Sequence, residues 1–337
     1  MPLGPCDALA HGNDQVMEDP ARLRCCARSQ HLTSLFPPTA GRREGLGHHI
    51  FMPSIRWSQQ RWNNRYYWDW ADDGETWSAN WGGSTAQWLT TIYPRLAPFL
   101  PTGSLVEIAP GKGRWTEYLL PHCASYLGVD VAELAVASCQ KRFAGHGGVQ
   151  FAVNDGLSLP MVDDRSADLV FSFDSLVHAE ADVIGAYSQE FRRILNPVGG
   201  VAFIHHSNLG VYHASAAVRD LLGHVFDAFS PTKAFMTRIG LAGWHGDRSR
   251  SVTAARFAEL ARSAGLACIG QEVISWGSPL LIDCISVLTL PGSKWDRESV
   301  YVRNRHFHSA ARSSASCAKV FAPDSRAREH PDEEAHT

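Results

Sequence analysis

The middle of the chain alternates short apolar runs with stretches of helical period. Five of these runs predict strands, at residues 104–109, 125–130, 149–153, 167–173 and 200–206. Apolar positions repeating about every 3.6 residues predict helices between them, at residues 115–120, 132–143 and 181–195. Near-continuous apolar strands separated by helices indicate a parallel sheet that is covered on both faces.

The last third of the chain continues this pattern with a change of direction. Residues 256–266 predict a helix, and residues 267–276 and 280–290 predict two strands that pair as an antiparallel hairpin at one edge of the sheet. The fold class expected is α/β, with a doubly wound, Rossmann-like, mostly parallel sheet of seven strands. This domain is expected over residues 104–292, and residues 209–250 form a lid-like insertion in it.

The segment before the first strand has a different composition. Residues 57–88 hold seven of the eleven tryptophans, interleaved with Asn, Gln, Asp and Gly. Such a segment is typical either of a binding surface or of helices that pack on the main domain, and the two interpretations are compatible. We expect an aromatic-rich helical cap over residues 51–103.

Outside these parts the chain shows no helical or strand period. Residues 1–50 predict a poorly ordered extension, and residues 293–337 predict a tail rich in Ser, Ala and Arg. Neither end is expected to belong to the fold.

Composition and charge describe an ordinary globular protein. The 337 residues are 45% hydrophobic and 19% charged, with a formal net charge of −3. This balance gives no reason to expect nucleic acid or a membrane surface as partner, and no apolar run is long enough for a membrane span. The eight cysteines contain no C-x-x-C pair and lie in apolar surroundings, which together with the lack of a signal peptide favours a cytoplasmic protein. Homo-oligomerisation is left open.

Polar residues follow the ends of the predicted strands, where ligands bind in open parallel sheets. The first strand ends in EIAPGKGRW, which places Gly111 and Gly113 in the turn to the next helix. A dinucleotide site would require a third glycine at position 116, which is Thr116, so the pattern of a nicotinamide oxidoreductase is incomplete.

The same stretch resembles motif I of class I S-adenosylmethionine-dependent methyltransferases, in which an acidic residue at the strand end is followed by a glycine loop. Here the motif runs from Glu107 to Gly113, and Ala109 stands where the first glycine is common. The resemblance implies a Rossmann-like fold that binds S-adenosylmethionine. Glu107, Ala109, Gly111 and Gly113 are then expected to surround this cofactor.

The next three strand ends carry the residues that this resemblance requires. It implies that Asp130, after the second strand, accepts the hydroxyl protons of the ribose. After the third strand, Asp155 is expected to meet the adenine amino group and Gly156 to let the base lie against the backbone. After the fourth strand, Asp174 is expected beside the methionine part of the cofactor.

Three histidines border the site that this arrangement predicts. Since Asp174 is not followed by the Pro-Pro-aromatic signature of many base N-methyltransferases, an alcohol acceptor is favoured, and its proton needs a base such as His. His178 lies in the helical region after the fourth strand, and His205 and His206 end the fifth. Neighbouring strand residues face opposite sides, so we expect one of this pair to face the pocket, and we favour His206.

A metal site is a second interpretation of these residues. Asp174, His178, Glu180, His205 and His206 are all types that bind divalent ions. Hard cations such as Mg²⁺ prefer more oxygen ligands, so a metal-assisted O-methyltransferase stays open as an alternative but is not favoured.

The acceptor is suggested by a narrower resemblance. The tryptophan-rich segment and the four motifs resemble bacterial methyltransferases of glycan and polysaccharide gene clusters. That resemblance implies O-methylation of a hydroxyl on a sugar, a glycosylated small molecule or a polysaccharide. The residues also leave open a methyltransferase that acts on a small-molecule natural product, and a cofactor-binding protein without catalytic activity.

Overall fold

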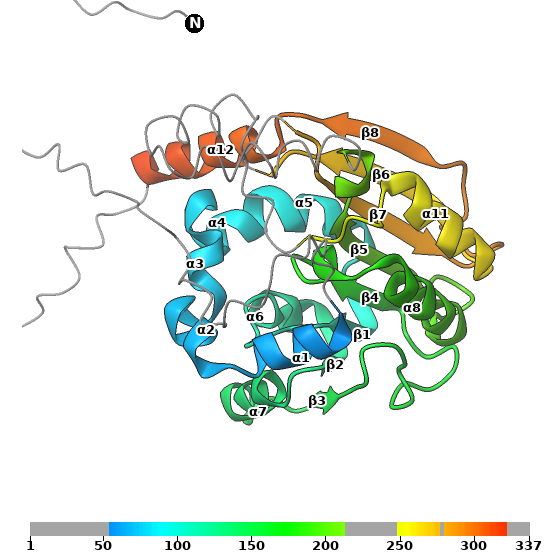
Figure 1. The fold of residues 1–337 in the computed structure, drawn as a ribbon, viewed down its shortest axis with the longest axis horizontal. Helices are drawn as coiled ribbons and strands as arrows, with labels where there is room; N and C mark the ends of the chain where they lie inside the picture. The colour runs from blue at the N-terminus through cyan, green and yellow to red at the C-terminus, as the bar shows by residue number, and fades with distance from the viewer. Residues whose placement is uncertain (1–53, 213–247, 277–279, 322–337) are drawn as a thin grey trace, which may run out of the picture. The chain divides into compact units, whose positions relative to one another are not determined.

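The computed structural model describes residues 54–212, 248–276 and 280–321 (Figure 1). The extension expected over residues 1–50 lies outside the described residues. So does most of the expected lid, because residues 213–247 belong to the part that is not described.

A single mixed sheet forms the centre of the described chain. Its order is β3-β2-β1-β4-β5-β7-β6-β8. The strands are β1 Thr102–Ile108, β2 Cys123–Asp130, β3 Val149–Val153, β4 Leu169–Ser172, β5 Val201–Ser207, β6 Ala267–Ile274, β7 Asp283–Thr289 and β8 Val300–Asn304. Strands β1 to β5 pair in parallel, and β7 is antiparallel to both β5 and β6. The Rossmann-like topology and the antiparallel hairpin are confirmed.

The predicted number of seven strands is wrong, because β8 adds an eighth. It pairs in parallel with β6 and lies at the edge of the sheet. Four of the five side chains of β8 are exposed, so the sequence contains no buried apolar run that would predict this strand. The tail expected from residue 293 is likewise wrong for residues 300–321, which form β8 and the helix α12 (Phe307–Phe321).

Helices cover both faces of the sheet. One face is covered by α8 (Ala181–Ile194) and α11 (Ala254–Ser263), whose apolar side chains join the larger core cluster. On the other face, α6 (Thr116–Leu119), α12 and the cap contribute to a second core cluster that is rich in aromatic rings. The helix α7 (Glu133–Arg142) lies beside β2 and β3. The layers can be followed in Figure 1.

The aromatic-rich cap consists of short helices before β1. They are α1 Ile55–Trp62, α2 Arg65–Trp70, η1 Asp72–Gly74, α3 Glu75–Ser78, η2 Ala79–Trp81, α4 Ser84–Gln87, η3 Trp88–Ile92, α5 Tyr93–Leu96 and η4 Ala97–Phe99. Ser54 caps α1 by accepting the Trp57 N–H at 3.1 Å. Trp81 and Trp88 are buried in the second core cluster, so part of the tryptophan-rich segment serves packing.

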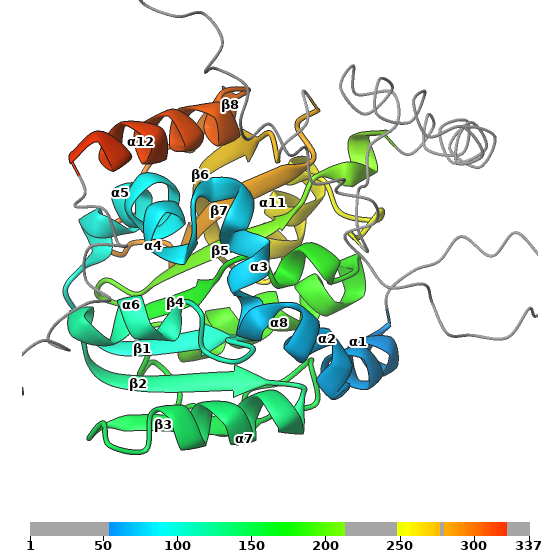
Figure 2. The same ribbon diagram turned by 90° about the vertical axis from the view of Figure 1, so that its left-hand side faces the viewer.

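The strand order reverses at β1, which pairs with β2 on one side and with β4 on the other. In doubly wound sheets, the crevice at such a point is where ligands bind. Figure 2 shows α1 and α2 beyond the arrowheads of β1 and β2, so the cap begins over this crevice.

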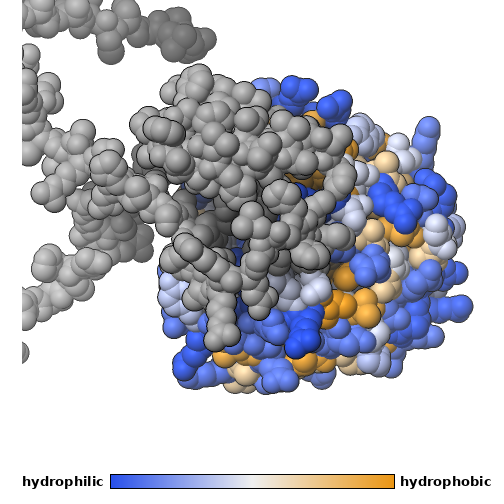
Figure 3. Space-filling model, in the orientation of Figure 1, coloured by the Kyte–Doolittle hydropathy of each residue, from blue (hydrophilic) through white to orange (hydrophobic). Residues whose placement is uncertain are grey.

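The described surface carries mixed chemistry. On the face drawn in Figure 3, hydrophilic side chains dominate and apolar ones form small separate patches. Across residues 54–212, 248–276 and 280–321, no helix has the length and apolar character that a membrane crossing requires.

Candidate active site

A cavity opens at the carboxyl ends of β1, β2 and β4. It encloses about 1000 Å³ of empty space, its open mouth included. The loops after these strands form one side, and α1, α2 and residues 73–77 form the other. Six of the eleven predicted site residues line it, namely Ala109, Gly111, Asp130, Gly156, Asp174 and His178.

The loop after β1 needs the backbone freedom of glycine. Gly111 has a φ of 59° and Gly113 a φ of 84°, both in the left-handed region. A Cβ on Gly111 would lie 2.7 Å from the Trp68 ring, and one on Gly113 would lie 2.5 Å from the Phe143 ring. Gly113 therefore shapes the loop by packing and does not line the cavity. Ala109, which replaces the usual first glycine, also adopts a positive φ, of 57°.

Asp130 connects the ends of β1 and β2. Its Oδ2 accepts the Gly111 N–H at 3.0 Å, and its Oδ1 accepts the Ala132 N–H at 2.9 Å. Burial raises the pKa of this carboxyl to about 6, although the backbone N–H groups around it act in the opposite direction. A carboxylate has about four lone-pair positions, and the backbone N–H groups of Gly111, Ala132 and Val131 leave one for a hydroxyl group of a ligand in the cavity.

Glu107 lies beneath the glycine loop and does not line the cavity. Its Oε2 accepts hydrogen bonds from the hydroxyls of Thr116, at 2.8 Å, and Tyr126. Burial raises the pKa of Glu107 to about 7, against the lowering effect of these two hydrogen bonds. Glu107 was expected to surround the cofactor directly. In the structure it supports the glycine loop from beneath and does not reach the cavity.

The residues after β3 divide into two roles. Gly156 lines the cavity with a φ of 82°. The Asp155 carboxylate turns away, is exposed, and accepts the N–H groups of Leu157 and Ser158 at 2.8 and 2.7 Å. These hydrogen bonds lower its pKa, the Leu157 N–H first. In this geometry Asp155 stabilises its own turn.

Asp174 is held at the cavity by an arginine that the sequence patterns did not single out. Its Oδ2 accepts from Arg114 Nη2 at 2.8 Å, and its φ of 62° places it in the left-handed region. Arg114 also donates to Ser78 Oγ at 3.1 Å and to the Gly74 carbonyl at 3.3 Å. The signal for Arg114 was its place directly after Gly113, in the loop that the motif defines.

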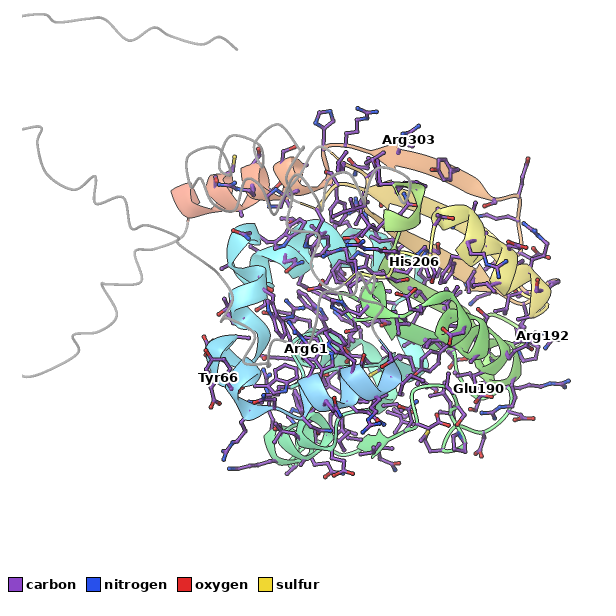
Figure 4. The ribbon with its side chains drawn as sticks, viewed as in Figure 1. Arg61, Tyr66, Glu190, Arg192, His206 and Arg303 are labelled. Atoms are coloured by element: carbon purple, nitrogen blue, oxygen red, sulfur yellow. The ribbon has the colours of Figure 1, made fainter. Side chains whose placement is uncertain are left out.

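The three predicted histidines are placed differently. His178, in η6 (Leu176–His178), lines the cavity, and its ring centroid lies 6.1 Å from that of Trp62. The prediction that His206 faces the pocket is wrong. Its ring is fully buried on the opposite face of β5, stacked on Phe257 of α11 at 3.9 Å, and its Nε2 bonds the Ser286 hydroxyl at 2.8 Å. Figure 4 shows it in the interior of the fold.

Burial lowers the pKa of His206 to about 3, so it is a neutral core residue. The reason for the wrong assignment is geometric. His206 has the same parity along β5 as Ala202 and Ile204, which belong to the core cluster under α8 and α11. His205 has the other parity and is packed between Phe173 and Trp276, with ring centroids at 4.6 and 4.9 Å, behind the cavity wall.

The metal cluster considered for these residues is not assembled. Glu180 is buried, and its Oε2 accepts from the hydroxyl of Ser249 at 2.9 Å and from that of Ser251. His206 lies across the sheet from Asp174. Within the part of the chain that the structure describes, no group of three His, Cys, Asp or Glu side chains is placed to hold a metal ion.

The cap side of the cavity is an aromatic wall formed by Trp62, Trp68 and Trp77. Their ring centroids lie 5.6 to 5.7 Å apart in tilted and edge-to-face pairs. Trp68 Nε1 donates to the Trp62 carbonyl at 2.8 Å, which fixes the ring that covers Gly111. The Lys112 ammonium bonds Asp73 of the cap and lies 5.6 Å from the Trp68 ring. The wall is thus attached to the glycine loop.

These residues fit S-adenosylmethionine. Asp130 offers a lone pair for a ribose hydroxyl, Gly111 and Gly156 leave room for close backbone approach, and Asp174 with Arg114 supplies polar groups for an amino acid part.

Comparisons with known proteins agree with this site. Residues 105–199 match a family model described as a methyltransferase domain. Squalestatin hexaketide synthase from Phoma sp. is 26% identical over 166 residues, and the match covers 43% of this chain and 6% of the synthase. The chain therefore spans only a small part of the length of this curated relative.

Two solved structures illustrate the structural likeness. The PH0226 protein from Pyrococcus horikoshii OT3 has 17% identity and a TM-score of 0.44, covering 61% of this chain and 90% of that one. An S-adenosylmethionine-dependent methyltransferase from Leishmania major has 10% identity and a TM-score of 0.47, covering 70% of this chain and 82% of that one. Both scores are below 0.5, so the assignment rests on the family model and on the site. Residues 105–199 thus form a methyltransferase domain, and the residues around its cavity support S-adenosylmethionine as its cofactor.

Proposed function

We propose that the enzyme methylates a hydroxyl group of a sugar or of a glycosylated small molecule. The observation that carries the proposal is the wall opposite the glycine loop, where Trp62 packs on Trp77 and lies 6.1 Å from the His178 ring, all three residues lining one cavity. Aromatic faces offer large, rigid contact area to the apolar face of a sugar ring. A histidine beside them supplies the base that a hydroxyl acceptor needs.

His178 is the base in this proposal, in place of His206. Of the three predicted histidines, it is the one that lines the cavity. S-adenosylmethionine supplies the methyl group as an electrophile bound to a sulfonium. His178 would take the hydroxyl proton as the methyl group passes from sulfur to the acceptor oxygen and S-adenosylhomocysteine is released, and the aromatic wall would hold the acceptor in line. Asp174 is engaged by Arg114 and orients the site.

An acceptor screen tests the proposal. The protein is incubated with S-adenosylmethionine and with panels of sugars, glycosylated small molecules, phenols, amines and carboxylates, and formation of S-adenosylhomocysteine is measured. Each panel is run with and without a chelator, because loss of turnover with chelator would favour a metal-assisted reaction. Turnover confined to amines or carboxylates would refute the proposal.

The role of His178 has its own test. His178→Ala is expected to lower kcat by roughly 10²- to 10⁴-fold, the usual range for a general base, while the affinity for S-adenosylhomocysteine changes little. His306→Ala is the matched control, because its side chain is exposed in the turn before α12, outside the cavity. Full activity of His178→Ala would remove the histidine base from the mechanism.

The partial match to a hexaketide synthase supports a second candidate, a natural product of the polyketide kind as acceptor. Hydroxylated polyketides therefore belong in the same screen. Turnover with them and with no sugar would favour this candidate over the sugar.

A further inference from the structure

We infer that His205 is a positioning residue of the methyl-transfer site, which fixes the turn that presents Asp174 to the cavity. His205 does not line the cavity and is fully buried. The Asp174 N–H donates to its Nδ1 at 3.0 Å, across 31 residues of sequence. His205 thus acts on the backbone of Asp174, from behind the wall.

The turn at Asp174 needs such an anchor. A non-glycine residue with a φ of 62° adopts a sparsely populated conformation that persists only where its surroundings hold it. Two contacts hold it from opposite sides, the His205 ring on the backbone N–H and the Arg114 guanidinium on the carboxylate. Without the His205 contact the Asp174 N–H would lose its hydrogen bond, and without the Arg114 contact the Asp174 carboxylate would lose its partner.

The next residue joins this turn to the glycine loop. Ser175 Oγ donates to the Ala109 carbonyl at 2.9 Å, and Ala109 itself has a positive φ. Movement of the Asp174 turn would therefore move the loop that carries Gly111. Because of this link, the affinity for the cofactor should report on the His205 anchor.

The orientation of the His205 ring is fixed by its other surroundings. Since Nδ1 accepts a hydrogen bond, the ring proton of the neutral form lies on Nε2, which faces Asp283 Oδ2 at 3.6 Å. Arg248 donates to both oxygens of Asp283, at 2.7 and 2.9 Å. Burial alone would raise the pKa of Asp283, but Arg248 and His205 outweigh it and hold that pKa well below its usual range. The carboxylate that Arg248 fixes thus lies beside the imidazole, at a distance longer than a hydrogen bond.

The Trp276 ring also contacts His205. It stacks on His205 with an interplanar angle of 27°, and the Arg248 guanidinium lies 5.6 Å from its centroid. Rings on both flat sides, Trp276 and Phe173, leave the imidazole one orientation. Packing and hydrogen bonds of this kind keep site residues in a productive geometry.

His206 provides an internal control. It is the neighbour of His205 on the same strand and equally buried, but it bonds Ser286 and packs on Phe257 on the other face. Replacing either histidine should cost stability. Only the replacement of His205 should affect the Asp174 turn.

The experiment compares His205→Leu, His205→Asn and His206→Leu in the full-length protein. The Asn side-chain oxygen can occupy the position of Nδ1 and accept the Asp174 N–H, whereas Leu cannot. Hydrogen exchange of the Asp174 amide is followed by NMR or mass spectrometry, affinity for S-adenosylhomocysteine by calorimetry, and Tm by thermal unfolding. No acceptor is needed, so the result is independent of the proposed sugar substrate.

We expect His205→Leu to lose the amide protection and to bind S-adenosylhomocysteine about 10- to 100-fold more weakly, the loss typical of one unsatisfied buried donor. His205→Asn should regain both within about threefold of the wild type on the same scale, and His206→Leu should lower Tm but keep protection and affinity. Unchanged protection in His205→Leu would overturn the inference. So would equal losses in His206→Leu, or an Asn variant that behaves as the Leu variant does, because both outcomes indicate a role in packing alone.

Discussion

The two sides of the cavity are built on different principles. The sheet side consists of loops whose backbone is fixed by buried carboxylates, with Asp130 on the N–H groups of Gly111 and Ala132 and Glu107 beneath them. The cap side consists of large rings, Trp62, Trp68 and Trp77, held by contacts with one another and with the loop. Polar groups with fixed directions suit one defined ligand, the cofactor. Flat apolar faces suit an acceptor that is recognised mainly by shape.

The largest effect should come from the sheet side. Asp130→Ala removes a carboxylate that orders the glycine loop and, in the class I arrangement, accepts the ribose hydroxyls. Loss of charge-assisted hydrogen bonds worth about 1.5 to 3 kcal/mol each should weaken binding of S-adenosylhomocysteine by about 100-fold or more, measured by calorimetry. Asp163→Ala, in an exposed turn before β4, is the control, and an equal loss there would contradict the assignment.

The second effect concerns the buried acid under the loop. The pKa of Glu107 is raised by burial from 4.5 to about 7, so the folded state binds its proton more tightly than the unfolded state. This stabilisation is complete below pH 4.5 and is lost as the pH rises through about 7. Glu107→Gln should therefore gain free energy of unfolding relative to the wild type between pH 5 and pH 8, by about 2 to 3 kcal/mol.

Urea unfolding of both proteins across this pH range measures the difference. Glu298→Gln, at an exposed position before β8, should show no such pH dependence. A constant difference between Glu107→Gln and the wild type would mean that Glu107 is ionised in the folded protein throughout.

The third prediction concerns the contact between Gly111 on the sheet side of the cavity and Trp68 on the cap side. Gly111→Ala places a methyl group 2.7 Å from the Trp68 ring at a φ of 59°, so the cap must shift away from the loop. We expect about tenfold weaker binding of S-adenosylhomocysteine, since overpacking costs about 1 to 3 kcal/mol. Gly145→Ala, where a Cβ would meet nothing within 4 Å, is the control. Trp68→Leu in the same chain should restore part of the loss, and no recovery would show that backbone strain alone causes it.

The smallest effect should separate cofactor from acceptor. Trp77→Leu removes one face of the aromatic wall and keeps the carboxylates and glycines of the sheet side, although it also removes the ring that lies 5.5 Å from the Arg114 guanidinium. We expect the KM of the acceptor found in the screen to rise about 3- to 10-fold, as for loss of one aromatic contact, with the affinity for S-adenosylhomocysteine nearly unchanged. Trp295→Leu, at the opposite end of the sheet where its Nε1 donates to the Gly199 carbonyl, controls for loss of a tryptophan. If the affinity for S-adenosylhomocysteine fell more than the KM of the acceptor rose, the aromatic wall would be part of the cofactor site and not of the acceptor site.

The sequence predicted the sheet side well because strand ends are local signals. Apolar runs that stop at Asp130, Gly156 and Asp174 located the cavity floor from the order of residues alone. The sequence did not predict the direction of side chains beyond these ends. Asp155 satisfies its own turn, and a choice between His205 and His206 depends on which face of β5 each occupies, which parity with the buried Ala202 and Ile204 could have indicated.

Features that depend on distant contacts were harder to predict. Arg114 reaches Asp174 across 60 residues, and β8 is an exposed edge strand with no apolar pattern of its own. The tryptophan-rich segment predicted a cap, but composition alone could not separate Trp81, which is buried in the core, from Trp62 and Trp77, which line the cavity.

The contacts of α12 also bear on the order in which the enzyme can become active during synthesis. Trp81 packs edge-to-face on Phe307 at 5.6 Å and on His308 at 4.6 Å, and the Arg95 guanidinium lies 4.6 Å from the Phe307 ring. The part of the cap that holds Trp81 and Arg95 therefore depends on the last described helix. On the ribosome, strands β1 to β5 and the glycine loop emerge before residue 307, whereas Trp81 and Arg95 lack these partners until then. A nascent chain would pass through a stage in which the glycine loop has its sheet and this part of the cap is not yet anchored.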